Sequence, residues 1–211
     1  MARVVIFGAT GGVGALAVEE ALAAGHAVTA QSRSMGRLAG LSEGVRAVAA
    51  DPLNPAQVQA AVAGDDAVIY ALGLRTLRPT PFFSDTTRIL IDTMLACAVP
   101  RLIAITGVGA GETRGHGGWV YERLIFPLVT RHIYADKDRQ EALIAVSGLD
   151  WTVLRPAPFA SRAPHTALEV HETVTPGLTL TRITRHEVAH LAVALLTDSD
   201  SHFKRLFVGH H

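Results

Sequence analysis

The chain has 211 residues, of which 49% are hydrophobic and 18% are charged, and its formal net charge is zero. This length suits one domain with a substantial core, and a balanced charge argues against a nucleic-acid partner. The single cysteine, Cys97, excludes an internal disulfide framework, and no segment has the pattern of a signal peptide or a membrane span. We therefore expect a cytoplasmic protein without a membrane partner.

Short apolar segments alternate along the chain with segments that carry apolar residues at helical spacing. The apolar segments are about five residues long and mostly continuous, which is typical of strands buried on both faces of a parallel sheet. The alternation predicts an α/β domain with a doubly wound sheet and right-handed crossovers. Strands are predicted at 3–7, 27–31, 46–50, 67–71, 101–105, 151–155 and 206–208, and helices at 14–24, 55–62, 86–98, 134–147 and 185–196.

The alternation stops between residues 156 and 184, where four prolines occur. We expect this segment to form a small substrate-side lobe, with a short hairpin around Pro176-Gly177, within a single domain over 1–211. His210 and His211 are left out of this prediction, because they could be native or the remnant of a tag.

Three glycines follow the first predicted strand in the spacing Gly8-x-x-Gly11-x-x-Gly14. If a dinucleotide binds here, Gly8 allows the tight turn, Gly11 lets the backbone approach the pyrophosphate, and Gly14 allows close helix packing. The helix N-terminus then offers free N–H donors to an anion, and Thr10 could add a hydroxyl. A glycine-rich turn without a ligand is the alternative, but the strand before and the helix after the motif favour the dinucleotide site.

The end of the second predicted strand indicates which dinucleotide binds. An NAD site places an acid there for the ribose hydroxyl, whereas the residues present are Gln31, Ser32, Arg33 and Ser34, with Arg37 beyond. Because a guanidinium can pair with a 2′-phosphate, Arg33 favours NADP(H). The alternative is that Arg33 is a solvated loop cation.

Two further stretches fit the same site. Asp51 could accept from the adenine amino group, or it could be a turn acid before Pro52. Ala71-Leu72-Gly73 ends the fourth strand, where we expect the backbone to pass close to the adenine ribose and the pyrophosphate.

The segments GATGGVG, ADPLN, DAVIYALG and KDRQEALIAVSGLDWTVLRPAPF resemble the atypical short-chain dehydrogenase/reductases. Within these, the chain is similar to the NAD(P)H-binding group that includes the biliverdin-IXβ/flavin reductases and the NmrA-like proteins. The resemblance implies a Rossmann domain with strand order 3-2-1-4-5-6-7, a preference for NADPH, and hydride delivery to a planar acceptor. Relatives often dimerise through the helices at 86–98 and 134–147, so a monomer or a homodimer is expected.

The resemblance also assigns roles to individual positions. Arg33 matches the arginine that binds the 2′-phosphate, and Asp51 and Leu53 match the adenine pocket. Thr106 matches the residue at the end of the fifth strand, beside the nicotinamide. Lys137 matches the lysine that contacts the nicotinamide ribose, and Pro156 matches the proline that closes the nicotinamide side of the site. A surface ion pair with Glu141 is the alternative for Lys137. Cofactor binding is predicted for Gly8, Thr10, Gly11, Gly12, Val13, Gly14, Ser32, Arg33, Asp51, Leu53, Ala71, Leu72, Gly73, Thr106, Lys137 and Pro156.

The chain departs from the family pattern where a proton donor is expected. Ile133 stands four residues before Lys137 in place of the tyrosine, Gly107 replaces a serine, and Pro158 or Phe159 replaces a histidine. Tyr134 is one residue further on and could still approach the site, so Thr106, Lys137 and Tyr134 are the catalytic candidates. A site without a strong acid fits a conjugated acceptor such as a flavin, quinone or tetrapyrrole, which spreads the added charge over its rings. The alternative is an NmrA-like NADP(H) sensor without turnover.

Three other features are weaker signals. The glycine-rich segment 107–119 is expected either to cover the acceptor site as a mobile flap or to be a surface connection. Arg75 and Arg78 could meet an anionic acceptor, although such arginines are more often solvated. His186 and His190 stand four residues apart, but no metal is expected.

Overall fold

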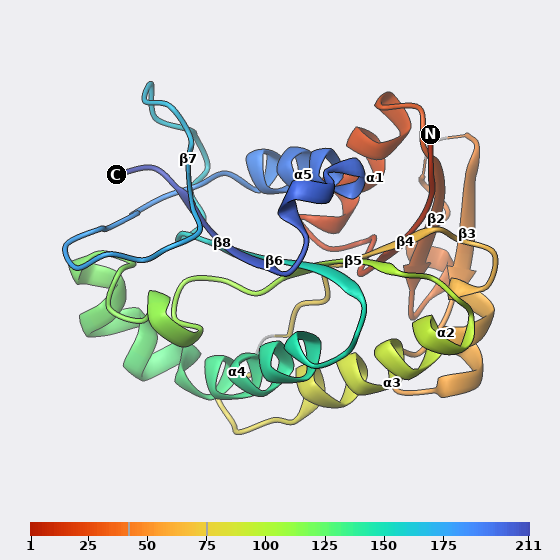
Figure 1. The fold of residues 1–211 in the computed structure, drawn as a ribbon, viewed down its shortest axis with the longest axis horizontal. Coiled ribbons are helices and arrows are strands. Elements are labelled where there is room, and N and C mark those ends of the chain that lie inside the picture. The colour runs from red at the N-terminus through yellow and green to blue at the C-terminus, as the bar shows by residue number, and fades with distance from the viewer. Residues whose placement is uncertain (42, 75) are drawn as a thin grey trace.

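The computed structural model describes residues 1–41, 43–74 and 76–211. Its centre is an eight-stranded sheet in the order β3-β2-β1-β4-β5-β6-β8-β7, in which only β7 is antiparallel to its neighbour (Figure 1). This confirms the predicted doubly wound sheet, because the predicted seventh strand is β8, which pairs with β6. The strands are β1 (Arg3–Phe7), β2 (Ala27–Ser32), β3 (Val45–Ala49), β4 (Ala67–Tyr70), β5 (Arg101–Ile105), β6 (Asp150–Pro156), β7 (Glu169–His171) and β8 (Lys204–Gly209).

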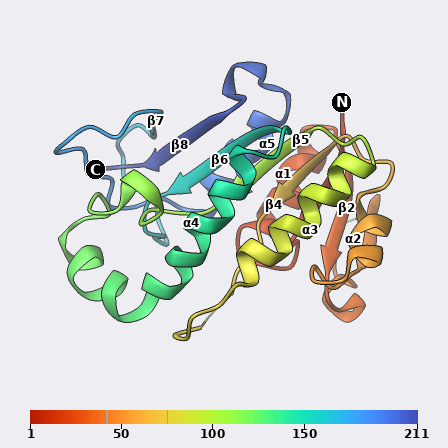
Figure 2. The ribbon, with the colours of Figure 1, turned by 60° about the horizontal axis from the view of Figure 1, so that its bottom comes forward.

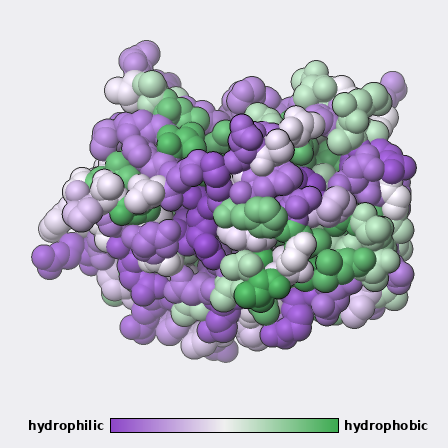
Figure 3. Space-filling view, in the orientation of Figure 1, coloured by the Kyte–Doolittle hydropathy of each residue, from purple (hydrophilic) through white to green (hydrophobic). Residues whose placement is uncertain are grey.

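Helices cover both faces of the sheet. The helices α1 and α5 contact each other on one face, whereas α2, α3 and α4 lie side by side on the other (Figures 1 and 2). Figure 3 shows mostly hydrophilic side chains on the face seen in Figure 1, interrupted by smaller apolar groups. None of the helices in the described residues is long and apolar enough to cross a lipid bilayer. The helices are α1 (Gly14–Ala23), α2 (Pro55–Val62), α3 (Phe82–Ala96), α4 (Arg131–Ala145) and α5 (Arg185–Ala194).

The continuous apolar strands are explained by two separate cores. In β1, Val4 and Ile6 are buried in the core beneath α1 and α5, whereas Val5 and Phe7 are buried in the core beneath α2, α3 and α4. Because successive side chains of a strand point to opposite faces, a strand between two helical layers needs apolar residues at every position.

Helix α3 begins four residues earlier than predicted because a side chain of α4 caps it. The backbone N–H of Phe83 donates to Asp136 Oδ2 at 2.7 Å, and Ser84 Oγ donates to Asp136 Oδ1 at 2.6 Å. A carboxylate at this position satisfies N–H groups that have no partner within the helix. The cap also brings Phe82 and Phe83 to the edge of the sheet.

The glycine-rich segment 107–119 begins with buried residues, whereas the helical segment that follows it is largely exposed apart from Tyr121. Gly107 to Ala110 are buried, Gly111 N–H donates to Asp138 Oδ1 at 2.8 Å, and Tyr121 Oη donates to the carbonyl of Val108 at 2.9 Å. The unpredicted segment Tyr121–Thr130 is π-helical and leads directly into α4.

The lobe at 156–184 lies beside the C-terminal residues. The predicted hairpin around Pro176-Gly177 does not form, because β7 pairs with β8 and the bridge from Phe159 is to Ile183. His210 is only 2% exposed, and its Nε2 lies 2.8 Å from Glu187 Oε1. His210 is therefore part of the packed structure.

Candidate functional site

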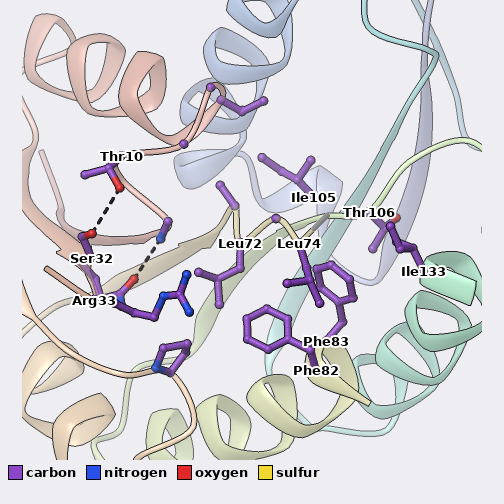
Figure 4. A pocket seen from close by; sticks show the side chains of 18 of the residues that line it. Thr10, Ser32, Arg33, Leu72, Leu74, Phe82, Phe83, Ile105, Thr106 and Ile133 are labelled. Carbon is purple, nitrogen blue, oxygen red and sulfur yellow. Dashed lines mark hydrogen bonds between the residues drawn. The ribbon is translucent and has the colours of Figure 1, made fainter. Parts of the chain in front are cut away.

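A cavity of about 980 Å³ opens at the carboxyl ends of β1, β2, β4 and β5 (Figure 4). Its lining combines the glycine loop, the end of β2, the segment after β4, the start of α3 and one face of α4. The predicted site residues that line it are Gly8, Thr10, Gly11, Gly12, Val13, Ser32, Arg33, Ala71, Leu72, Gly73, Thr106 and Lys137. The predicted residues outside the lining are Gly14, Asp51, Leu53, Tyr134 and Pro156.

The glycine loop packs tightly against its own backbone and against the segment after β4. Gly8 has φ of +82°, and a Cβ there would lie 2.7 Å from the carbonyl oxygen of Ala71. A Cβ at Gly14 would overlap the carbonyl oxygen of Gly8, so Gly14 serves the close packing of α1 on the loop and is shielded from the cavity.

The loop nevertheless leaves donors for a ligand. Helix α1 has no side-chain cap at Val13, and the N–H groups of Gly12 and Val13 donate to no oxygen among the described residues. Free N–H groups at a helix N-terminus bind phosphate and similar anions. The loop therefore fits the pyrophosphate of a dinucleotide.

Gln31 holds this loop against the sheet and was not singled out by the sequence. Its Oε1 accepts from Gly8 N–H at 3.0 Å, and its Nε2 donates to the carbonyl of Ala50 at 2.5 Å. A second tie joins Thr10 Oγ1 and Ser32 Oγ at 3.2 Å (Figure 4). The sequence did contain one indication of this role, a glutamine inside an otherwise apolar strand. A buried side-chain amide needs hydrogen-bond partners, so such a glutamine is expected to bond to nearby backbone groups.

The charged residues that line the cavity are all cationic. They are Arg33, Arg37, Lys137 and Arg185, and the described lining contains no carboxylate. None of these four side chains forms an ion pair with another described residue. In a chain without net charge, this concentration of positive charge favours an anionic ligand.

Asp51 takes part in a turn at the edge of this region. Its Oδ1 accepts from Leu53 N–H at 3.0 Å, and its own N–H donates to Gln57 Oε1 at 2.7 Å. Leu53 is 47% exposed, and Pro52 lines the cavity instead. The structure thus places Asp51 in the turn that was its alternative role.

Arg75 and Arg78 were the two arginines considered for an anionic acceptor. Arg75 lies outside the described residues.

The far end of the cavity is apolar and contains one cation. The side chains that point into this region come from the segment after β4, the start of α3 and the start of α4, and they are Leu72, Leu74, Phe82, Phe83 and Ile133 (Figure 4). Their side chains form a surface suited to a flat ring system.

Lys137 lies at this apolar end and is only 6% exposed. Its Nζ donates to the carbonyl of Ile105 at 3.2 Å and lies 4.3 Å from the centre of the Phe83 ring. Burial lowers the pKa of Lys137 to about 8, although the nearby carboxylates of Glu141 and Asp136 oppose this shift. The alternative of a surface ion pair with Glu141 does not hold, because Lys137 is buried and Glu141 pairs with Arg155 at 2.5 Å.

The two hydroxyl candidates for proton transfer are both engaged elsewhere. Thr106 lines the cavity, but its Oγ1 donates to Glu141 Oε1 at 2.7 Å. Tyr134 packs against Phe126 and against the Cα of Gly107, outside the lining. Burial raises the pKa of Tyr134 well above its usual value, which keeps its proton on the hydroxyl.

Segment 107–119 contributes no residue to the lining. His116 Nδ1 contacts the carbonyl of Leu178, and Trp119 is 70% exposed. His186 and His190 of α5 both contact Glu20 of α1, and no group of three His, Cys, Asp or Glu within the described ranges is arranged to hold a metal.

Three solved structures illustrate which proteins share this fold. A Rossmann-fold NAD(P)-binding family protein from Shigella flexneri is 21% identical, with 100% of this chain and 94% of that chain covered and a TM-score of 0.76. ChuY, an anaerobilin reductase from Escherichia coli O157:H7, is 23% identical over 98% and 96% of the two chains, with a TM-score of 0.79. A wide-type short-chain dehydrogenase/reductase from Veillonella parvula, solved in complex with NADP, is 17% identical over 99% and 95%, with a TM-score of 0.80.

A family model supplies the assignment at the level of sequence. The model of the NAD(P)H-binding family matches residues 8–199, which include the glycine loop, the cationic lining and helix α5. The chain therefore belongs to the NAD(P)H-binding family.

Proposed function

We propose that the protein is an NADPH-dependent reductase that transfers hydride to a planar conjugated acceptor, such as a flavin, a quinone or a tetrapyrrole. The observation that carries this proposal is the composition of one cavity. Free backbone donors and the unpaired arginines Arg33, Arg37 and Arg185 lie at one end, and an aromatic and aliphatic surface with Lys137 lies at the other. The cavity volume of about 980 Å³ is at the upper end of the range for small-molecule sites, about 300–1,000 Å³.

The choice of NADPH rests on the end of β2. Arg33 and Arg37 line the cavity there, and the described lining offers no carboxylate to a ribose hydroxyl. A guanidinium pairs well with a phosphate monoester through parallel N–H donors. The complex of the Veillonella parvula protein with NADP supports the same choice.

The choice of a conjugated acceptor rests on the apolar end. When bound, the nicotinamide would supply the hydride, and the chain would contribute positioning by Phe82, Phe83 and Ile133. The reduction of an isolated ketone benefits from an acid within hydrogen-bond reach, and the hydroxyl of Thr106 is directed to Glu141. We assign Lys137 to the nicotinamide ribose. The anaerobilin reductase activity of ChuY supports an acceptor of the tetrapyrrole kind.

The test is a set of oxidation assays with purified protein and NADPH. The nicotinamide absorbance band is followed anaerobically with FMN, a short-chain quinone and a linear tetrapyrrole, and with simple ketones as matched controls. We expect oxidation with at least one planar acceptor and none with the ketones. Faster turnover of a simple ketone would contradict the acceptor class, and tight NADPH binding without oxidation by any acceptor would indicate a regulatory NADP(H)-binding protein.

A further inference from the structure

Arg185 is the cation of the cavity that comes from farthest along the chain. It is the first residue of α5, and it lies about 170 positions after the glycine loop. Both Arg185 and the glycine loop line the cavity. Helix α5 packs against α1, so that the beginnings of the two helices meet at the same opening.

The start of α5 is held firmly in place. Thr184 Oγ1 accepts from Glu187 N–H at 3.2 Å, and Glu187 Oε2 accepts from Thr184 N–H at 2.8 Å, which completes a capping box. The other carboxylate oxygen of Glu187 contacts the buried His210 at 2.8 Å. Arg185 is therefore presented from a rigid helix end.

The side chain of Arg185 lies directly on Gly12. A Cβ built on Gly12 would lie 2.9 Å from both Cδ and Nε of Arg185. Gly12 has no positive φ that would itself demand glycine. Its missing side chain is explained by the space that Arg185 occupies.

The guanidinium is placed for a ligand and has no protein counter-ion. It lies 4.7 Å from the centre of the Phe159 ring, which also lines the cavity. Within residues 1–41, 43–74 and 76–211, no carboxylate oxygen lies within 4.0 Å of it. The side chain lies against the loop segment whose N–H groups at Gly12 and Val13 are free.

We propose that Arg185 binds the pyrophosphate of the dinucleotide beside the glycine loop, an inference that rests on the proposed function. Rossmann loops bind pyrophosphate with backbone donors and the partial charge of a helix. Arg185 adds a full positive charge to the two anionic groups that NADH and NADPH share. The lining cations are then divided, with Arg33 and Arg37 selecting the 2′-phosphate and Arg185 strengthening the binding of either cofactor.

The experiment compares dissociation constants for NADPH, NADH and adenosine 2′-monophosphate in wild type and Arg185→Ala, measured by calorimetry at low salt. We expect Arg185→Ala to weaken NADPH and NADH by the same factor, about 10-fold, and to leave adenosine 2′-monophosphate unchanged because it has no pyrophosphate. The difference should shrink as salt is added. Arg182→Ala is the matched control, because Arg182 is exposed three residues earlier and does not line the cavity.

A second variant tests the contact with Gly12. Gly12→Ala should weaken both cofactors in the wild type by displacing the guanidinium, and should cost much less in the Arg185→Ala background. Circular dichroism of each variant checks that the fold is retained.

Three results would overturn the inference. A loss confined to NADPH would place Arg185 at the 2′-phosphate, and a change only in the KM of the acceptor would place it at the acceptor. Unchanged binding of both cofactors would leave Arg185 as a rim residue. If wild type binds neither dinucleotide, the proposed function itself fails, which is a distinct result.

Discussion

The hydroxyl group of Tyr134 occupies the space that a side chain at Gly107 would need. A Cβ built on Gly107 would overlap Tyr134 Oη, and Gly107 also has φ of +140°. Two departures from the family pattern, the tyrosine at position 134 instead of 133 and the glycine at 107 instead of a serine, are therefore explained by the same packing contact. A serine at 107 could not coexist with Tyr134 in this position.

Tyr134→Phe should reduce turnover less than threefold, because Tyr134 lies outside the cavity lining. Loss of a general acid would instead cost about 10²–10⁴-fold. The measurement is kcat for the best planar acceptor from the assays above. A loss of that larger size would show that Tyr134 reaches the acceptor during turnover. Tyr121→Phe, which removes a hydroxyl bonded to the carbonyl of Val108, is the matched control for packing.

Arg33→Ala should weaken NADPH binding by about 10- to 100-fold, since hydrogen bonds to charged groups contribute about 1.5–3 kcal/mol. NADH binding should change little, because NADH lacks the 2′-phosphate. Calorimetric titration with both cofactors checks this, with Arg162→Ala, an exposed arginine outside the lining, as the control. Equal losses for NADPH and NADH would refute the assignment of Arg33 to the 2′-phosphate.

Lys137 should impose a pH dependence on kcat/KM. Its pKa of about 8 means that the ammonium group of the free enzyme loses its proton as the pH rises through 8. We expect kcat/KM to fall above this pH, because the cationic donor at the nicotinamide end is lost. Lys137→Met should be less active and show no such transition. A transition that persists in Lys137→Met would belong to another group.

The same group predicts how stability responds to pH. The pKa of Lys137 is lower in the folded chain than its usual value of 10.5, so the unfolded chain binds more protons between about pH 8 and 10.5. The contribution of Lys137 to the free energy of unfolding therefore increases with pH across this window. The wild type minus Lys137→Met difference in denaturant titrations, measured at pH 7.5 and 9.5, checks this sign.

Gln31→Leu should lower the free energy of unfolding by about 1–3 kcal/mol, because Gly8 N–H and the carbonyl of Ala50 lose their partner in a buried site. It should also weaken both cofactors, since the glycine loop loses its tie to β2. Urea titration and calorimetry measure the two effects. Gln59→Leu, the same substitution at an exposed position of α2, is the control, and similar effects in both variants would contradict this role of Gln31.

Much of the fold was predictable because the burial of an element determines which of its own positions must be apolar. A strand between two helical layers must be apolar at both faces, as in residues 3–7, and a helix beside one layer must be apolar at helical spacing. The motif from Gly8 to Gly14 was readable for the same reason, since tight turns and close packing demand glycine locally. Arg33 was predicted to bind the 2′-phosphate because the carboxyl end of β2 contains no acid, and it lines the cavity.

Residues that meet only through tertiary packing could not be found in this way. Asp136 decides where α3 begins, although it lies 53 positions from Phe83. Arg185 reaches Gly12 from the far end of the chain, and Asp51 is directed to a turn instead of the cavity. Propensity and periodicity describe neighbours along the chain, whereas the partner of a charge or a hydroxyl depends on distances that exist only after the helices have packed on the sheet. The sequence by itself therefore determined the layers and the glycine loop, and tertiary structure decided which cations remained unpaired around it.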